Sequence, residues 1–348
     1  GVMNIYGKTY YEGYMVTGWL TLGSDWYYFD NTGKRLTGLQ KVGNNLFYFN
    51  DSCKMQTGWQ KVSNKWYYFD DSGYGQSGWK KLGNTWFYFN SQYQMLTGWQ
   101  RINGKWYYLS TGVMEIYGKT YYEGYMVTGW LPLGNRWYYI ANDDYMVTGY
   151  YKVGNSTYYF DESGLMKTGW FKINGEDYYA ASSGAIQAQW VKSLSNWYYV
   201  DVDGKMVTGY QTINGAKYYF ASSGLMQKDW FKINGEDYYA ASSGAIQAQW
   251  VKSLSNWYYV DVDGKMVTGY QTINGAKYYF ASSGLMQKDW FKINGEDYYA
   301  ASSGTIQAQW VKSGRNWYYV DTDGKMVTGD YIIDGKVNHF DNQGLWMN

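Results

Sequence analysis

The sequence predicts an all-β fold, an elongated solenoid of β-hairpins built from repeats of about 20 residues. Gly-Trp steps return with a 20-residue period, as at Gly58-Trp59 and Gly78-Trp79. Aromatic residues make up 22% of the 348-residue chain, with 44 Tyr and 20 Trp, whereas Pro occurs once. Asn-Gly pairs, the strongest short hairpin signal, separate several of the aromatic runs. These three observations indicate one small unit repeated many times.

Residues 59–78 illustrate a single repeat. A strand is predicted over 59–62, a polar turn at 63–64 and an aromatic strand over 65–69. Aromatic residues favour strands, and the Asp-Asp-Ser-Gly run that follows is typical of a turn. The repeat is therefore expected to be a hairpin followed by a short connecting loop.

Hairpins of this size have to stack on their neighbours. An isolated hairpin is only marginally stable in water, and 20 residues cannot bury a core alone. Along the second strand, Trp66 and Tyr68 share one face and Tyr67 lies on the other. One face can build an aromatic spine, while the other can line a groove between successive hairpins. Many of the rings must serve as core.

The single solenoid of residues 1–348 is expected to begin with two blocks, residues 1–111 and residues 112–169. Where they meet, the spacing of the period changes. Trp99 and Trp130 are 31 residues apart, which predicts an extra hairpin of about 11 residues. The stretch that begins the second block repeats the first 20 residues of the chain with one difference, at Glu115.

The third block, residues 170–329, repeats a larger unit of 60 residues that contains three hairpins. Residues 170–229 are identical to residues 230–289, and a third copy begins at residue 290. Residues 330–348 are a degenerate repeat and are expected to form a terminal cap. Terminal repeats of solenoids are commonly atypical in this way because they cap the core.

The charge and composition exclude several classes of partner. The net charge is +1 and Lys alternates with Asp and Glu, so the phosphates of a nucleic acid find no cationic stripe. No apolar run approaches the ~20 residues that span a bilayer. The lone Cys53 cannot form an internal disulfide, which leaves an exported location open.

Catalytic and metal chemistry also lack the residues they need. His339 is the only histidine, and no catalytic set, metal site or cofactor motif accompanies it. Asp201 and Asp203 begin like a calcium loop, but Met and Val follow where oxygen ligands are needed. A feature repeated in every unit indicates binding, so we expect no enzyme activity, no cofactor and no bound metal.

The repeats resemble the choline-binding, or cell-wall-binding, repeats of Gram-positive surface proteins. The resemblance is carried by TGWQKVSNKWYYFDDSG at 57–73 and QWVKSLSNWYYVDVDGKMVTG at 189–209. The segment TGYQTINGAKYYFASSGLM at 208–226 is more similar to the related repeats of streptococcal glucan-binding domains and clostridial toxin tails. Together these motifs cover nearly the whole chain.

The resemblance implies a ligand site between consecutive hairpins. Two Trp of one repeat form two walls of a cage, and an aromatic residue of the next repeat forms the third. A quaternary ammonium donates no hydrogen bond, so the ring quadrupoles attract it, at ~0.5–2 kcal/mol per favourable face. The cages this implies are Trp79/Trp86/Tyr107, Trp99/Trp106/Tyr121, Trp130/Trp137/Tyr158, Trp190/Trp197/Tyr218 with Met206, Trp250/Trp257/Tyr278 with Met266, Trp19/Trp26/Phe47 and Trp59/Trp66/Phe87.

Other repeats depart from the cage pattern. Asp replaces the second Trp after Trp170, Trp230 and Trp290, at Asp177, Asp237 and Asp297. Lys217 and Lys277 follow Tyr210 and Tyr270 in the same way. Trp310/Trp317 meets Asn338 in place of an aromatic third wall, so this cage is expected to be broken. A Trp beside an Asp suits a sugar, which stacks on the ring and hydrogen-bonds at its rim.

Three functions remain open. The first is a non-catalytic module of a secreted, cell-surface protein that binds choline on teichoic or lipoteichoic acids, where many weak sites gain from multivalency. The second is a carbohydrate-binding module for a glucan or glycan, favoured by the Trp–Asp and Tyr–Lys repeats. The third is a structural extracellular fibre or stalk. Self-association through the terminal cap is a further open alternative for its partners.

Overall fold

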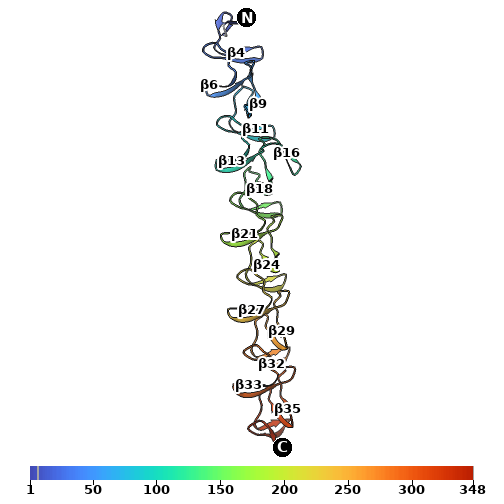
Figure 1. Ribbon diagram of the computed structural model, residues 1–348. Helices are drawn as coiled ribbons and strands as arrows, with labels where there is room; N and C mark the ends of the chain where they lie inside the picture. Colours follow the sequence, from blue (N-terminus) through green and yellow to red (C-terminus); the bar gives the residue numbers. More distant parts are fainter. Residues whose placement is uncertain (6–7, 348) are drawn as a thin grey trace. The chain divides into compact units, whose positions relative to one another are not determined.

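The computed structural model describes residues 1–5 and 8–347, and every regular element in this part of the chain is a β-strand (Figure 1). None of the described residues forms a helix that could cross a membrane. The chain divides into two compact units. Unit 1 contains Gly1–Phe171 and Ala180–Ile186, and unit 2 contains Lys172–Tyr179 and Gln187–Asn348.

The first unit begins with a three-stranded meander, and most of its other strands pair as two-stranded hairpins. Its strands are β1 (Val2–Ile5), β2 (Lys8–Tyr11), β3 (Tyr14–Met15), β4 (Gly18–Leu22), β5 (Asp25–Phe29), β6 (Gly38–Val42), β7 (Asn45–Phe49), β8 (Met55–Gln56), β9 (Gly58–Val62), β10 (Lys65–Phe69), β11 (Gly78–Leu82), β12 (Thr85–Phe89), β13 (Gly98–Ile102), β14 (Lys105–Leu109), β15 (Met114–Ile116), β16 (Lys119–Tyr121), β17 (Gly129–Leu133), β18 (Arg136–Ile140), β19 (Gly149–Val153) and β20 (Ser156–Phe160).

The boundary between the units runs through one hairpin, formed by β21 (Gly169–Ile173) and β22 (Glu176–Ala180). The later strands are β23 (Gln189–Ser193), β24 (Asn196–Val200), β25 (Gly209–Ile213), β26 (Ala216–Phe220), β27 (Asp229–Ile233), β28 (Glu236–Ala240), β29 (Gln249–Ser253), β30 (Asn256–Val260), β31 (Gly269–Ile273), β32 (Ala276–Phe280), β33 (Asp289–Ile293), β34 (Glu296–Ala300), β35 (Gln309–Ser313), β36 (Asn316–Val320), β37 (Gly329–Ile333), β38 (Lys336–Phe340) and β39 (Trp346–Met347). The predicted all-β hairpin repeat is confirmed.

The register within each hairpin places the aromatic residues on two different faces. In β9–β10, Trp59 pairs with Tyr68, and Lys61 pairs with Trp66. Because side chains alternate along a strand, Trp59, Trp66 and Tyr68 share one face. Tyr67 points to the opposite face and is only 5% exposed. One face of the hairpin therefore faces the core, and the other remains partly open to solvent.

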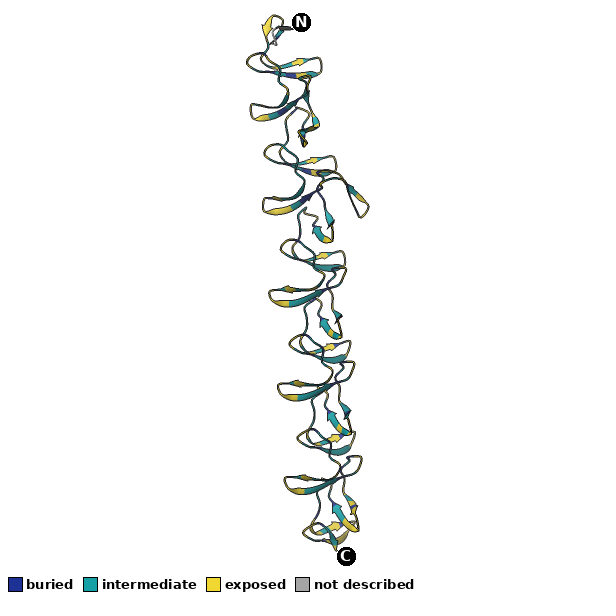
Figure 2. Cartoon of the chain, in the orientation of Figure 1, coloured by how far each residue is buried: buried dark blue, intermediate teal, exposed yellow. Residues whose placement is uncertain are grey.

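The core is a column formed by the last residue of each second strand. Phe69, Val260 and Ala300 occupy this position in three different hairpins, and each has no exposed surface. Exposed residues gather at the hairpin tips instead (Figure 2). The expected spine is therefore not aromatic throughout. The smaller residue Ala240 is accompanied by Phe231, whose ring stacks 5.5 Å from Tyr219 and supplies the missing ring.

Backbone hydrogen bonds link each hairpin to the loop beyond the next one. Met95 N–H donates to Trp66 O at 2.8 Å, and Met226 N–H donates to Trp197 O at 2.9 Å. Each hairpin otherwise forms its own small sheet, so these bonds and the packed side chains between hairpins order the stack. The loop that follows a hairpin consequently lies against the hairpin before it.

The extra hairpin predicted between Trp99 and Trp130 is present as β15–β16. It projects sideways from the neighbouring hairpins, at the position marked β16 (Figure 1). The base of this hairpin is buried, since Ile116 and Tyr121 are 6% and 3% exposed. Its insertion also places the following loop, residues 122–125, beside an earlier hairpin.

Candidate functional site: the aromatic cages

Two indoles of one hairpin form a corner at each cage. In six of the seven cages expected from the sequence, the ring centroids of the two Trp lie 6.0–6.4 Å apart and the ring planes meet at 81–89°. The hairpin register causes this, because the first Trp and the cross-strand partner of the second lie on the same face, two residues apart. These pairs are Trp19/Trp26, Trp59/Trp66, Trp79/Trp86, Trp130/Trp137, Trp190/Trp197 and Trp250/Trp257.

The next hairpin supplies the third ring. Its centroid lies 4.8–5.0 Å from the first Trp in the same six cages. The residues that do so are Phe47, Phe87, Tyr107, Tyr158, Tyr218 and Tyr278. The structure thus brings together the three residues that the sequence suggested for each of these cages.

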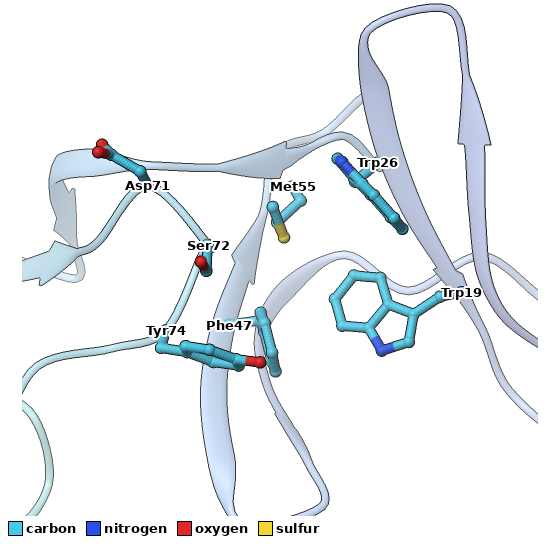
Figure 3. Close-up of a pocket in the computed structure, with 7 residues that line it drawn as sticks. All are labelled: Trp19, Trp26, Phe47, Met55, Asp71, Ser72 and Tyr74. Atoms are coloured by element: carbon cyan, nitrogen blue, oxygen red, sulfur yellow. The ribbon is translucent and has the colours of Figure 1, made fainter.

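A methionine closes each cage from the loop beyond the second hairpin. Figure 3 shows Trp19 and Trp26 on one side of their pocket, Asp71, Ser72 and Tyr74 on the other, and Phe47 and Met55 between them. The pocket formed by Trp190, Trp197 and Tyr218 is lined by Met226 in the same way. Met226 packs on Gly244, where a Cβ would come within 2.5 Å of the sulfur and where φ is +84°. A glycine is therefore needed beneath this methionine.

The methionines expected at two cages were wrong. Met206 N–H donates to Asp177 O and Met266 N–H to Asp237 O, both at 2.9 Å. These two methionines lie at junctions where Asp replaces the second Trp. Met226 lines the Trp190/Trp197 pocket, and Met286 N–H donates to Trp257 O at 2.9 Å. The cause is the backward course of each loop, which places a methionine one junction earlier than its position in the sequence suggests.

The third wall expected for Trp99 was also wrong. The ring of Trp99 lies 5.1 Å from that of Tyr138. Tyr121 is buried in the core of the inserted hairpin, and its hydroxyl donates to Thr128 O at 3.1 Å. A residue that is 3% exposed has no surface for a ligand. Counting a fixed number of residues forward had reached the inserted hairpin instead of the next regular one.

The second wall expected for Trp99, Trp106, was wrong as well. The rings that the described residues place against Trp99 are those of Tyr108 and Tyr138, each at 5.1 Å. Trp106 forms no such corner with Trp99, and its side chain is 41% exposed. The backbone here is regular, because Trp106 O accepts a hydrogen bond from Met146 N–H at 2.8 Å. The departure is therefore confined to the side chain, whose indole lies open to solvent instead of walling a cage.

The expectation of an enclosed wall at Trp86 needs a smaller correction. Trp86 forms the expected corner with Trp79, at 6.4 Å and 89°, but its side chain is 37% exposed. The methionine whose N–H donates to Trp86 O, at 3.1 Å, is Met126, and its side chain is buried. Met126 follows the inserted hairpin, so the insertion supplies this junction with a methionine that packs in the core. Trp86 is thus an open outer wall, not the side of a closed cage.

The chain end replaces the ring missing at Trp310/Trp317. The centroid of Trp346 lies 5.4 Å from that of Trp310, and Trp346 Nε1–H donates to Asn338 Oδ1 at 3.2 Å. The expectation of a broken cage is corrected to that extent, because β39 adds a third ring. The local repeat pattern contains no signal for Trp346, since the residue lies beyond the last regular hairpin.

One cage is enlarged by residues around the inserted hairpin. The pocket of Trp59, Trp66 and Phe87 has a volume of about 820 Å³, whereas those at Trp19, Trp130 and Trp190 have about 410, 450 and 430 Å³. Tyr122, Glu123 and Tyr125 line it. Trp66 Nε1–H donates to Glu123 Oε2 at 3.1 Å, so a carboxylate lies at the rim of this cage. Sequence reasoning missed these three residues.

At the Trp–Asp junctions, one wall of the cage is polar. Trp230 keeps its third ring, with Tyr258 at 5.4 Å. In place of the second indole, Asp237 forms an ion pair with Lys232 at 2.7 Å. Trp290, Asp297 and Lys292 repeat the arrangement. These junctions offer one aromatic face beside a charged, hydrogen-bonding edge.

The Tyr–Lys junctions are filled by the chain itself. Lys217 Nζ forms an ion pair with Asp263 Oδ1 at 2.5 Å, and Tyr210 Oη–H donates to Asp263 O at 2.9 Å. Tyr270 and Asp323 form the same bond at 2.8 Å, and Lys277 pairs with Asp323. Burial at this closed junction, together with the nearby Tyr238 and Asp263, raises the pKa of Tyr210 to about 12.

The open cages suit a compact cation without hydrogen-bond donors. Their walls are ring faces and a thioether, and Trp197 already has the ammonium of Lys192 5.6 Å from its ring centroid. The described residues contain no group of three or more His, Cys, Asp or Glu side chains that could hold a metal ion. What recurs from hairpin to hairpin is the aromatic corner and its methionine.

Two family models match the chain. The choline-binding repeat model matches residues 36–74, 147–189, 207–249 and 267–307. The cell wall binding repeat model matches residues 17–34, 77–92, 97–112, 189–206, 249–266 and 309–326. The two models alternate along the chain and together cover most of it. No curated protein sequence matches the chain significantly.

Solved structures of Streptococcus pneumoniae proteins are similar to this chain. CbpJ from the TIGR4 strain is 27% identical, over 82% of this chain and 98% of CbpJ, with a TM-score of 0.36. Choline-binding protein F, in the presence of a peptidoglycan analogue, is 25% identical over 84% and 98%, with a TM-score of 0.41. The choline-binding domain of CbpL is 30% identical over 52% and 98%, with a TM-score of 0.40. On the family models, the chain belongs to the choline-binding, cell-wall-binding repeat family.

Proposed function

We propose that the chain is a non-catalytic module of a secreted protein that attaches to the bacterial cell wall by holding choline of teichoic or lipoteichoic acids in its aromatic cages. The observation that carries the proposal is the recurring corner of two perpendicular indoles closed by a third ring, as at Trp190, Trp197 and Tyr218. A quaternary ammonium fits this corner because it needs ring faces and no hydrogen-bond acceptor.

Repetition of the cage explains how weak sites give firm attachment. Each cage offers a trimethylammonium group about 0.5–2 kcal/mol per favourable ring face, which leaves a single site weak. A polymer that displays many choline groups can occupy several cages of one chain at once. Linked sites of this kind can raise the overall affinity by about 10²–10⁴-fold without any new contact.

The test is retention of the whole chain on a choline-bearing resin, followed by elution with free choline. Calorimetry with free choline then counts the sites. Trp197→Ala, which removes one wall, is expected to lower the number of sites by one. The matched control is Lys217→Ala at the closed junction, which should leave the number unchanged. Retention that free choline does not reverse, or a site count unaffected by Trp197→Ala, contradicts the proposal.

A carbohydrate is the second candidate, and the Trp–Asp junctions favour it. Trp230 offers a ring on which a sugar can stack, and the paired Asp237 and Lys232 offer polar groups at its edge. Soluble glucan added in parallel to the resin experiment separates the two candidates. Glucan binding that Trp230→Ala abolishes, with choline binding retained, would assign the sugar to these junctions. A chain that binds neither ligand would favour the structural fibre.

A further inference from the structure

The pocket walls repeat, but the pocket rims do not. The pocket at Trp130 and the pocket at Trp190 have seven lining residues at corresponding positions, counted along the repeats. Six of the seven are identical in type: two Trp, a Tyr, a Met and two Ser. The seventh is Thr168 in the first pocket and Lys228 in the second. Two nearly identical cages therefore differ by one charged group.

A lysine beside a cation cage needs an explanation. Lys228 is exposed and also lines a smaller hollow on the far side of Trp197, next to Met226. Other lysines of the same unit have carboxylate partners, as Lys232 has Asp237 and Lys265 has Glu236. A second positive charge at the rim repels a ligand that is only a cation. It attracts the ligand when an anion follows the ammonium group within a few bonds.

We propose that the cages bearing Lys228 and Lys288 select a zwitterion, a quaternary ammonium linked to a phosphate ester, with the lysine contacting the phosphate. The inference rests on the proposed function, because the ammonium occupies the same cage. Lys288 follows Met286 in the next repeat as Lys228 follows Met226, so both cages carry the feature. Ser242 and Ser243 add hydroxyl donors at the rim, and an ammonium and hydroxyls together suit phosphate oxygens.

The enlarged cage at Trp66 is the opposite case. At the position of Ser243 it has Glu123, whose carboxylate accepts a hydrogen bond from the Trp66 indole at 3.1 Å. A carboxylate there attracts a plain cation and repels a phosphate. The chain therefore contains a cationic rim, a neutral rim at Thr168 and an anionic rim, around cages with the same aromatic walls. This series provides the controls for the test.

The experiment follows the indole N–H signals of Trp66, Trp137 and Trp197 by NMR while choline or phosphocholine is added to the whole chain. Glycerophosphocholine, a phosphodiester with one charge, distinguishes the ester of a polymer from the free monoester. At Trp197, phosphocholine is expected to bind about twofold to fivefold more tightly than choline. Trp137 should show no preference, and Trp66 should prefer choline.

Variants that exchange the rims complete the test. Lys228→Thr with Lys288→Thr should remove the phosphocholine preference at Trp197 and leave choline affinity unchanged, whereas Thr168→Lys should create the preference at Trp137. Lys265→Thr with Lys325→Thr removes the same net charge away from the cages and should change nothing. Equal preferences at all three signals, or no effect of the rim variants, would overturn the inference. Absence of any choline-dependent shift would instead overturn the proposed function.

Discussion

The open Trp190/Trp197 junction and the closed Tyr210/Lys217 junction are built on the same hairpin and lie next to each other. Their strands have the same lengths and the same register. In the open junction, two indoles form a corner lined by Met226. In the closed junction, Lys217 reaches Asp263 from a later turn, and Tyr210 bonds to the same residue.

The difference teaches that one position decides whether a junction is available to a ligand. A Trp at the second cage position adds a ring face and leaves the corner empty. A Lys at that position supplies an internal ammonium, which lies 5.8 Å from the ring centroid of Tyr210 in one junction and 4.8 Å from that of Tyr270 in the other. The closed junctions thus carry a cation of their own beside the ring.

Converting a closed junction into an open one tests the comparison most severely. Lys217→Trp removes the internal cation and supplies a second indole between Tyr210 and Tyr238. We expect one additional choline site per converted junction, with an affinity within about tenfold of a native cage. Calorimetric site counting measures the gain, and Lys217→Ala, which supplies no ring, is the control. An unchanged site count in a folded variant would show that the second ring is not sufficient.

The glycines beneath the two junctions are expected to differ in their effect on stability. A Cβ on Gly264 would lie 2.8 Å from the carbonyl oxygen of Tyr239, which cannot move aside. A Cβ on Gly244 would meet only the flexible Met226 side chain. Both positions have positive φ, so each alanine substitution should cost about 1–3 kcal/mol, with Gly264→Ala the more costly. Denaturant unfolding measures this, and the reverse order would contradict the structure.

Alkaline pH should weaken the closed junctions first. Burial raises the pKa of Tyr210 to about 12, whereas an unfolded Tyr ionises near 10. The stabilisation from this phenol is therefore complete below about pH 10 and is lost as the pH rises toward 12. The unfolding midpoint followed from pH 9 to 12 should fall less steeply in Tyr210→Phe with Tyr270→Phe. If both proteins lose stability equally, the tyrosines of the closed junctions do not carry the effect.

The two near-identical segments, residues 1–20 and 112–131, show how far sequence alone can predict burial. Tyr121 is 3% exposed and Leu131 is fully buried, whereas their counterparts Tyr10 and Leu20 are only half-buried. Tyr14 is 81% exposed at the start of the chain. The later segment has regular hairpins both before and after it, and these cover its side chains.

Local pattern was sufficient for the walls that lie in regular repeats. The 20-residue period predicted the hairpins, and it placed Trp190, Trp197 and Tyr218 together because strand alternation and register are local properties.

The same pattern was insufficient where a residue comes from a loop or an insertion. Met226, Tyr138 and Trp346 each reach a cage from a segment whose course the period does not describe. Beside the inserted hairpin, the period also placed Trp106 in a cage that it does not wall and Trp86 in one that stays open. Both errors arise because a fixed spacing cannot represent the extra hairpin.

The sequence by itself therefore determined the hairpin fold, the repeat and the pairs of indoles in regular repeats, because each depends on residues within one hairpin or at a constant spacing. Only the tertiary structure decided which junctions are open, which methionine lines each cage and which charge stands at its rim. Lys217 finds Asp263 and Trp66 finds Glu123 across long separations in the chain. Such contacts depend on how each loop turns back over the preceding hairpin, which hydrogen bonds between separate repeats determine.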